Sequence, residues 1–79
     1  MDYSLVSYLS RRPIKETEKA LLYYMEESCW ETFRVTNDKI FLLLEKRYAQ
    51  EQLSMPPEIA QAKLVHQHRL SLLGKKKEK

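Results

Sequence analysis

The side chains best suited to chemistry in this chain are Cys29, His66 and His68. A nucleophilic site needs the cysteine or a serine beside a histidine and an acid, and no local motif groups them in this way. On a helix, His66 and His68 point about 200° apart, whereas two ligands of one metal ion need a spacing of three or four residues. We therefore expect no metal site, with His66 on an inner helix face and His68 in solvent.

Nucleotide binding through a glycine-rich loop is excluded, because such loops need several glycines and Gly74 is the only one. A small core of this kind also seldom holds catalytic groups in a fixed arrangement. The sequence of 79 residues therefore predicts a protein that is not an enzyme and that uses no cofactor.

Aromatic side chains gather between residues 23 and 33, and two interpretations of this cluster are open. In the first, Tyr24, Trp30 and Phe33 complete the hydrophobic core. In the second, Tyr23 and Trp30 form an exposed pair beside acidic residues, which is the composition of a protein-binding hot spot. Leu64 also falls on a polar helix face. The candidate interaction residues are Tyr23, Trp30, Phe33, Arg34 and Leu64.

The net charge of +3 is concentrated at the C-terminus. Of the 14 basic and 11 acidic residues, residues 75–79 hold four and one, which leaves ten of each sign in residues 1–74. A domain that binds a phosphate backbone usually carries its basic surplus on the folded surface. The neutral body argues against nucleic acid, and an electrostatic tail is expected at Lys75, Lys76, Lys77 and Lys79.

The apolar spacing predicts helices that position these residues. A short helix is expected over residues 2–10, and a longer one begins at Pro13 and runs to about residue 28 or 30. A further helix is capped by Thr36 or Asn37. The last begins at Pro57 and runs to about Leu73, with Gly74 as a left-handed terminator. Its inner face is expected to hold Ile59, Ala62, His66, Leu70 and Leu73.

The middle helix carries two nearly opposite apolar stripes. Such a helix must be covered on both flanks, by the other helices or by a partner. If the second stripe lies beside Leu64, it marks a homodimer or partner groove. The first stripe is Ile40, Phe41, Leu44 and Tyr48, and the second is Leu42, Ala49 and Leu53.

We therefore expect an all-α fold, a small three-helix bundle with a short extra N-terminal helix. Residues 1–74 form one helical domain and residues 75–79 a disordered, flexible lysine-rich tail. The lone cysteine closes no intrachain disulfide, no apolar run approaches the roughly 20 residues of a membrane span, and no signal peptide is visible. The expected location is the cytoplasm.

The favoured function is a non-enzymatic protein-interaction module, an adaptor, regulator or inhibitor. The alternative is a nucleic-acid-binding protein of the helix-turn-helix type, in which Lys63 and Arg69 contact the phosphates or bases. The segment from Gln50 to Pro57 is longer than the turn of that motif. Attachment of the lysine tail to a membrane surface is a third hypothesis.

Leu-Leu-Tyr-Tyr at 21–24 and Ile-Phe-Leu-Leu-Leu at 40–44 fall on expected helices, without site chemistry and with a terminal lysine run. In this, the chain resembles the small host-takeover proteins of lytic bacteriophages. The resemblance is one of type, and no residue role is transferred from it. It implies binding and inhibition of a bacterial host protein in the host cytoplasm.

Overall fold

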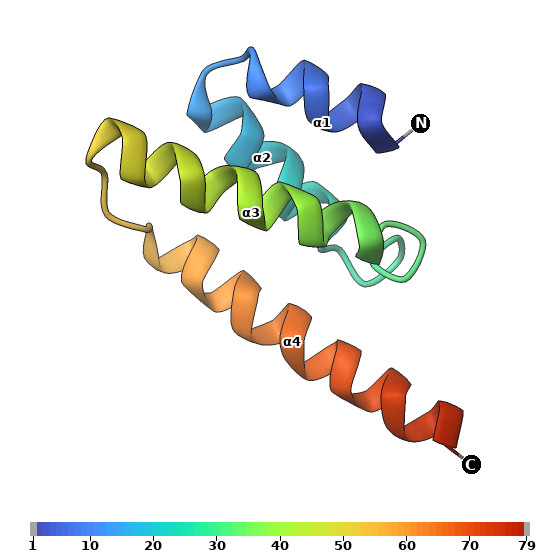
Figure 1. Ribbon diagram of the computed structural model, residues 1–79. Coiled ribbons are helices and arrows are strands. Elements are labelled where there is room, and N and C mark those ends of the chain that lie inside the picture. Colours follow the sequence, from blue (N-terminus) through green and yellow to red (C-terminus); the bar gives the residue numbers. More distant parts are fainter. Residues whose placement is uncertain (1, 79) are drawn as a thin grey trace.

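The computed structural model describes residues 2–78, with the side chains of residues 5–74. Four helices follow one another, α1 (Asp2–Ser10), α2 (Ile14–Tyr24), α3 (Arg34–Glu51) and α4 (Pro57–Glu78). α1 lies on one side of the α2–α3 pair and α4 on the other, and α4 diverges from α3 toward its own C-terminus (Figure 1). Residues 2–78 contain no strand, so the expected all-α fold with an extra N-terminal helix is confirmed.

The core lies where one face of each helix meets the others. Burying each large apolar side chain contributes about 1.5–3 kcal/mol relative to leaving it exposed. The first stripe of α3 and the inner face of α4 lie in or against this core, as predicted. The buried apolar residues are Leu9, Leu21, Met25, Trp30, Ile40, Phe41, Leu44, Tyr48, Ile59 and Ala62.

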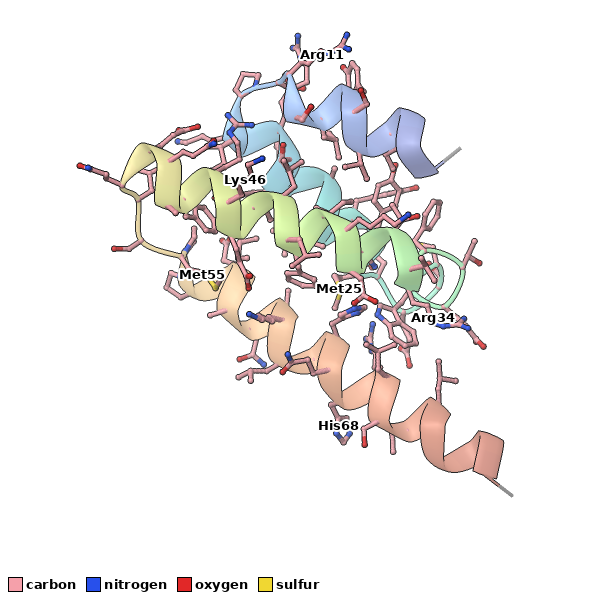
Figure 2. All side chains as sticks on the ribbon, viewed as in Figure 1. Arg11, Met25, Arg34, Lys46, Met55 and His68 are labelled. Atoms are coloured by element: carbon pink, nitrogen blue, oxygen red, sulfur yellow. The ribbon has the colours of Figure 1, made fainter. Side chains whose placement is uncertain are left out.

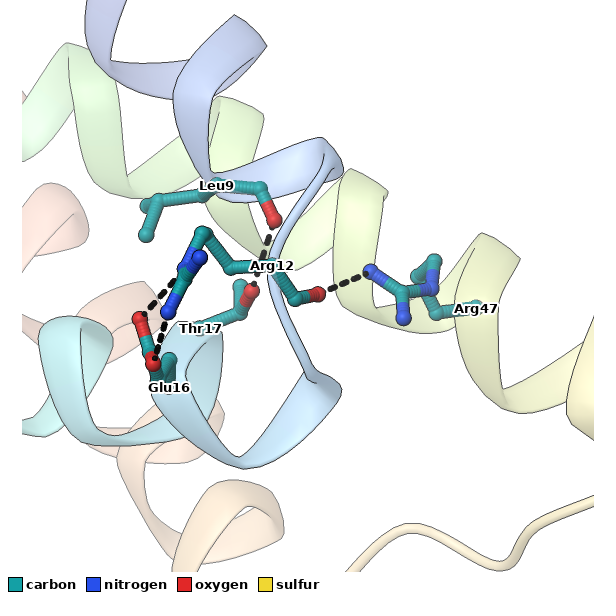
Figure 3. Close-up of polar contacts among 5 residues, drawn as sticks. All are labelled: Leu9, Arg12, Glu16, Thr17 and Arg47. Carbon is teal, nitrogen blue, oxygen red and sulfur yellow. Dashed lines mark hydrogen bonds and ion pairs between the residues drawn. The ribbon is translucent and has the colours of Figure 1, made fainter.

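Polar contacts hold the corner between α1 and α2 (Figure 3). The buried hydroxyl of Thr17 donates to the Leu9 carbonyl at 3.2 Å, and the Arg47 guanidinium of α3 donates to the Arg12 carbonyl at 3.2 Å. Arg12 also forms a two-bonded ion pair with Glu16, and this hydrogen bonding lowers the pKa of the Glu16 carboxyl. Both ends of the short connection are thereby fixed to neighbouring helices.

α2 ends at Tyr24, earlier than the expected residue 28 or 30, and side chains from other helices bind the carbonyls at and just after its end. The Asn37 amide donates to the Tyr24 carbonyl at 3.2 Å, and the Arg69 guanidinium donates to the Met25 carbonyl at 2.8 Å. Residues 25–33 then form successive turns.

α3 begins at Arg34, so the expected cap at Thr36 or Asn37 is wrong. Both side chains lie inside the first turn and are buried, where Asn37 serves the end of α2 instead. The residue before the helix, Phe33, makes no side-chain capping bond. Tertiary contacts thus decide where α3 begins.

The left-handed residue that ends a helix is Gln52 after α3, with φ at 56°, and not Gly74. α4 passes through Gly74 and ends at Glu78, so the expected helix end is wrong. Lysine and glutamate, which follow Gly74, are good helix formers. The side chains of Lys75, Lys76 and Lys77, and all of Lys79, lie outside the described residues, so the flexible tail stays a prediction.

The second stripe of α3 is exposed, with Leu42 at 66% and Leu53 at 47% of full exposure and Ala49 also in solvent. Leu53 lies just beyond the end of the helix. Because α1, α2 and α4 all pack on or beside the first stripe, they do not cover this face. Cover by the other helices, one of the two expected alternatives, is therefore wrong for the second stripe.

Candidate functional site

Three aromatic rings form an ordered row where α2 meets the 25–33 loop. The Tyr24 and Phe33 rings stack with centroids 4.3 Å apart, and the Tyr23 ring meets Tyr24 edge-on at 5.4 Å. Tyr24 and Phe33 are half-buried, whereas Tyr23 is 66% exposed. The inner rings therefore support an outer tyrosine whose face and hydroxyl reach solvent.

Charged residues follow both ends of this row in the sequence. Glu26 and Glu27 follow directly in the loop and are exposed. The Arg34 guanidinium donates one bond to the Glu31 carbonyl at 3.3 Å, which positions the group at the start of α3. We name Tyr23, Tyr24, Phe33 and Arg34 the Tyr23 surface.

Trp30 lies in the core at 6% exposure, so an exposed Tyr23–Trp30 pair is wrong. The pairing assumed a helix up to residue 30, but the chain leaves the helix at Met25 and turns the indole inward. The interpretation that Trp30 completes the core is confirmed.

The indole of Trp30 belongs to a polar network that sequence reasoning missed. Its Nε1–H donates to Nδ1 of buried His66 at 2.9 Å, so the histidine proton sits on Nε2, which donates to Oδ1 of Asp38 at 2.7 Å. The Arg69 guanidinium stacks over the indole at 5.4 Å. A histidine on an apolar helix face was the available signal, because both its ring nitrogens need partners when buried.

A groove of about 390 Å³ lies between α3 and α4. Its apolar wall and floor come mainly from Phe41, Leu42 and Leu70. Leu64 is 64% exposed and lies one turn before the lining residue Gln67 on α4. The polar lining residues are Asp38, Glu45, Lys63, His66 and Gln67.

The candidate residues therefore divide between two places and the core. Tyr23 and Phe33 belong to one aromatic row at the α2–α3 junction, and Arg34 follows Phe33 directly at the start of α3. Leu64 is exposed on α4, and Trp30 is interior.

Both cations that the nucleic-acid alternative requires are engaged within the chain. Lys63 forms an ion pair with Glu45, and Arg69 is held by the Met25 carbonyl and the Trp30 ring. These contacts hold the two side chains against α3 and the loop. The structure therefore adds no support for a recognition helix in α4.

Other classes of site find no geometric support. Among the described residues, no three His, Cys, Asp or Glu side chains are grouped so that they could hold a metal ion, and His68 is exposed as expected. The Cys29 thiol lies 3.4 Å from the Tyr23 carbonyl. None of the described helices combines the length and apolar character needed to cross a membrane.

Comparisons of the chain with protein-family models, curated proteins and solved structures found no match.

Proposed function

We propose that this protein is a non-enzymatic interaction module that binds, and regulates or inhibits, a cellular protein of a bacterial host. The Tyr23 surface is the proposed contact. The observation that carries the proposal is the exposed Tyr23 ring, held in place by the Tyr24–Phe33 stack.

Tyrosine and arginine are the residue types that most often dominate binding energy at protein interfaces. A ring that is already oriented loses little conformational freedom on binding, so more of its contact energy appears as affinity. Arg34 adds guanidinium donors beyond the one bonded to Glu31. A partner with an apolar pocket and acceptor groups beside it fits this surface.

The bacterial origin of the target rests on the resemblance to phage host-takeover proteins. The lysine tail, residues 75–79, would speed the encounter with an acidic partner through long-range attraction, which salt screens. Compared with nucleic-acid binding, this function agrees better with the neutral body and the internally paired cations of α4.

The test starts from capture of a bacterial protein by the immobilised full chain, followed by its identification and purification. The purified protein is then titrated with wild type, Tyr23→Ala and Tyr8→Ala, each checked for unchanged helix content. Tyr8 is a matched control because it is also an exposed tyrosine, at 55%, on α1.

We expect Tyr23→Ala to weaken binding by about tenfold or more, and Tyr8→Ala to bind within about twofold of wild type. Equal binding by all three proteins, or failure of any purified bacterial protein to bind, would contradict the proposal. A further assay of the captured protein's own activity with and without this chain distinguishes an inhibitor from an adaptor.

A further inference from the structure

The solvent-facing side of α3 carries an uncovered apolar row. Val35, Leu42 and Ala49 are spaced by seven residues and all are exposed, Leu42 at 66% and Val35 at 52%. Residues seven apart lie on one helix face with a drift of about 20° per step. The fully buried Ile40 and Leu44 lie on the opposite face, where the core is.

Opposite charges line the two edges of this row. At about 100° per residue, Asp38 and Glu45 lie about 40–60° to one side of Leu42, and Lys39 and Lys46 lie about 40–60° to the other. Asp38 contacts His66 and Glu45 contacts Lys63, so the acidic edge faces α4. Figure 2 shows Lys46 on the side of α3 away from α4, and Lys46 is exposed.

The acidic edge is also one wall of the α3–α4 groove. Leu42 and Phe41 line this groove from α3, and Leu70 lines it from α4. A helix laid along the apolar row would therefore also cover part of the groove. Positive side chains on that helix would face Asp38 and Glu45.

α3 itself is a helix with these properties. Two copies related by a two-fold axis parallel to α3 place the acidic edge of each copy opposite the basic edge of the other. An antiparallel arrangement would instead bring acid against acid and base against base, which is unfavourable. The charge pattern therefore favours a second copy as occupant and the parallel orientation, with Glu45 then shared between Lys63 of its own chain and Lys46 of the other copy.

We propose that this chain forms a parallel, two-fold symmetric homodimer through α3, with Leu42 of the two copies in contact near the axis. Lys46 of each copy lies over Glu45 and the groove of the other. The apolar row is short compared with stable dimer interfaces, so the dimer forms reversibly with a Kd of about micromolar or weaker.

Sedimentation of the full chain over a wide concentration range tests the assembly. Wild type is expected to show a monomer–dimer equilibrium, which Leu42→Glu weakens by about tenfold or more. The matched control is Leu72→Glu, which should dimerise like wild type. Leu72 is 46% exposed and lies on α4, on a face other than the one that lines the groove. Helix content measured on each variant confirms that the fold is retained.

The charged edges are tested first with Lys46→Glu alone, which should weaken the homodimer. They are then tested with a mixture of the Lys46→Glu and Glu45→Lys variants. At the level of residues 45 and 46, one variant then carries acids on both edges and the other carries bases on both edges, so the mixture should form heterodimers more tightly than either variant forms homodimers. Only monomer at all concentrations, or an unchanged dimer in Leu42→Glu, would overturn the proposal.

Orientation is tested in a Cys29→Ser background with a single new cysteine at Val35 or at Ala49. A parallel dimer predicts that each variant crosslinks to itself under mild oxidation, whereas crosslinks only between position 35 and position 49 would show an antiparallel dimer and refute this arrangement. Tyr23→Ala should dimerise normally, so failure here and failure of the proposed host-protein contact are distinguishable.

Discussion

At the scale of single residues, burial gives several polar side chains roles that their types alone do not reveal. His66 is buried, and both of its ring nitrogens are hydrogen-bonded, one to Trp30 and the other to Asp38. Asn37 is buried and holds the end of α2. Each of these groups joins elements that lie apart in the sequence, which ties the loop and α3 to α4 and α2.

Tyr48 is a further buried polar group, and its titration has a measurable consequence. Its hydroxyl donates to Oε2 of Glu18 at 2.8 Å. Burial, and then the hydrogen bond and the charge of that carboxylate, raise the pKa of Tyr48 above its ordinary value of 10.0. The folded protein therefore keeps this proton at a pH where the unfolded chain loses it.

We predict that the stability contributed by the raised pKa of Tyr48 is present below about pH 10. It is lost as the pH rises further, because only the unfolded state then gains by ionising. Tyr48→Phe should cost about 1–3 kcal/mol at neutral pH. Near pH 11, the difference in unfolding free energy between wild type and Tyr48→Phe should be smaller than at neutral pH by about 1 kcal/mol. Urea unfolding at both pH values measures the gap, Tyr8→Phe serves as control, and a constant gap would refute the prediction.

At the scale of helices, side chains from neighbouring elements decide where several of them end. At the end of α2, Asn37 binds the Tyr24 carbonyl and Arg69 binds the carbonyl of the following residue, Met25. The last turn of α2 contains no basic residue of its own, so the Arg69 guanidinium supplies a positive charge at this negative end of the helix dipole. α4 thus stabilises α2 through one long side chain.

Arg69→Met should therefore destabilise the protein by about 1.5–3 kcal/mol, since it removes a charge-assisted bond to a helix carbonyl and a cation–π contact. Lys63→Met is the matched control on the same helix. It removes only a partly exposed ion pair with Glu45 and should cost less than about 1 kcal/mol. Denaturant midpoints compare the two, and equal losses would show that Arg69 does not act as a cap.

Gly74 gives a second test at this scale. Its φ is not positive, and a Cβ added to it would meet no atom within 4 Å, so alanine fits there without strain. Gly74→Ala should raise helix content and stabilise the protein by up to about 1 kcal/mol.

The reverse kind of substitution, to glycine, suits Gln52, because glycine adopts the left-handed conformation of this residue without cost. Gln52→Gly should stabilise by a similar amount, measured by circular dichroism and urea unfolding. If Gly74→Ala instead destabilises, Gly74 is the left-handed end of the helix in solution.

At the scale of the whole molecule, charge and apolar surface are distributed unevenly. Ten acidic and ten basic residues cancel over residues 1–74, while residues 75–79 carry the whole net charge of +3. The exposed apolar side chains include Tyr23 at one end of α2 and Leu42 on the open face of α3. These two surfaces carry the proposed host-protein contact and the proposed homodimer.

Removal of residues 75–79 tests the meaning of the charge. Because the remaining body is neutral, any binding of the full chain to duplex DNA should disappear in the truncated chain, and binding by the full chain should fall steeply with salt. Fluorescence anisotropy at several salt concentrations measures both. Retained, salt-dependent DNA binding by residues 1–74 would favour the nucleic-acid function over the protein-binding one.

Residue spacing predicted the helical class, the inner faces of α3 and α4, and the start of α4 at Pro57, because helical periodicity and proline act locally. It did not predict the end of α2, the start of α3, the inward turn of Trp30 or the exposure of the second stripe of α3. Each of these depends on which distant groups satisfy backbone carbonyls and cover apolar faces, and such pairings follow from three-dimensional packing, not from the spacing of residues along the chain.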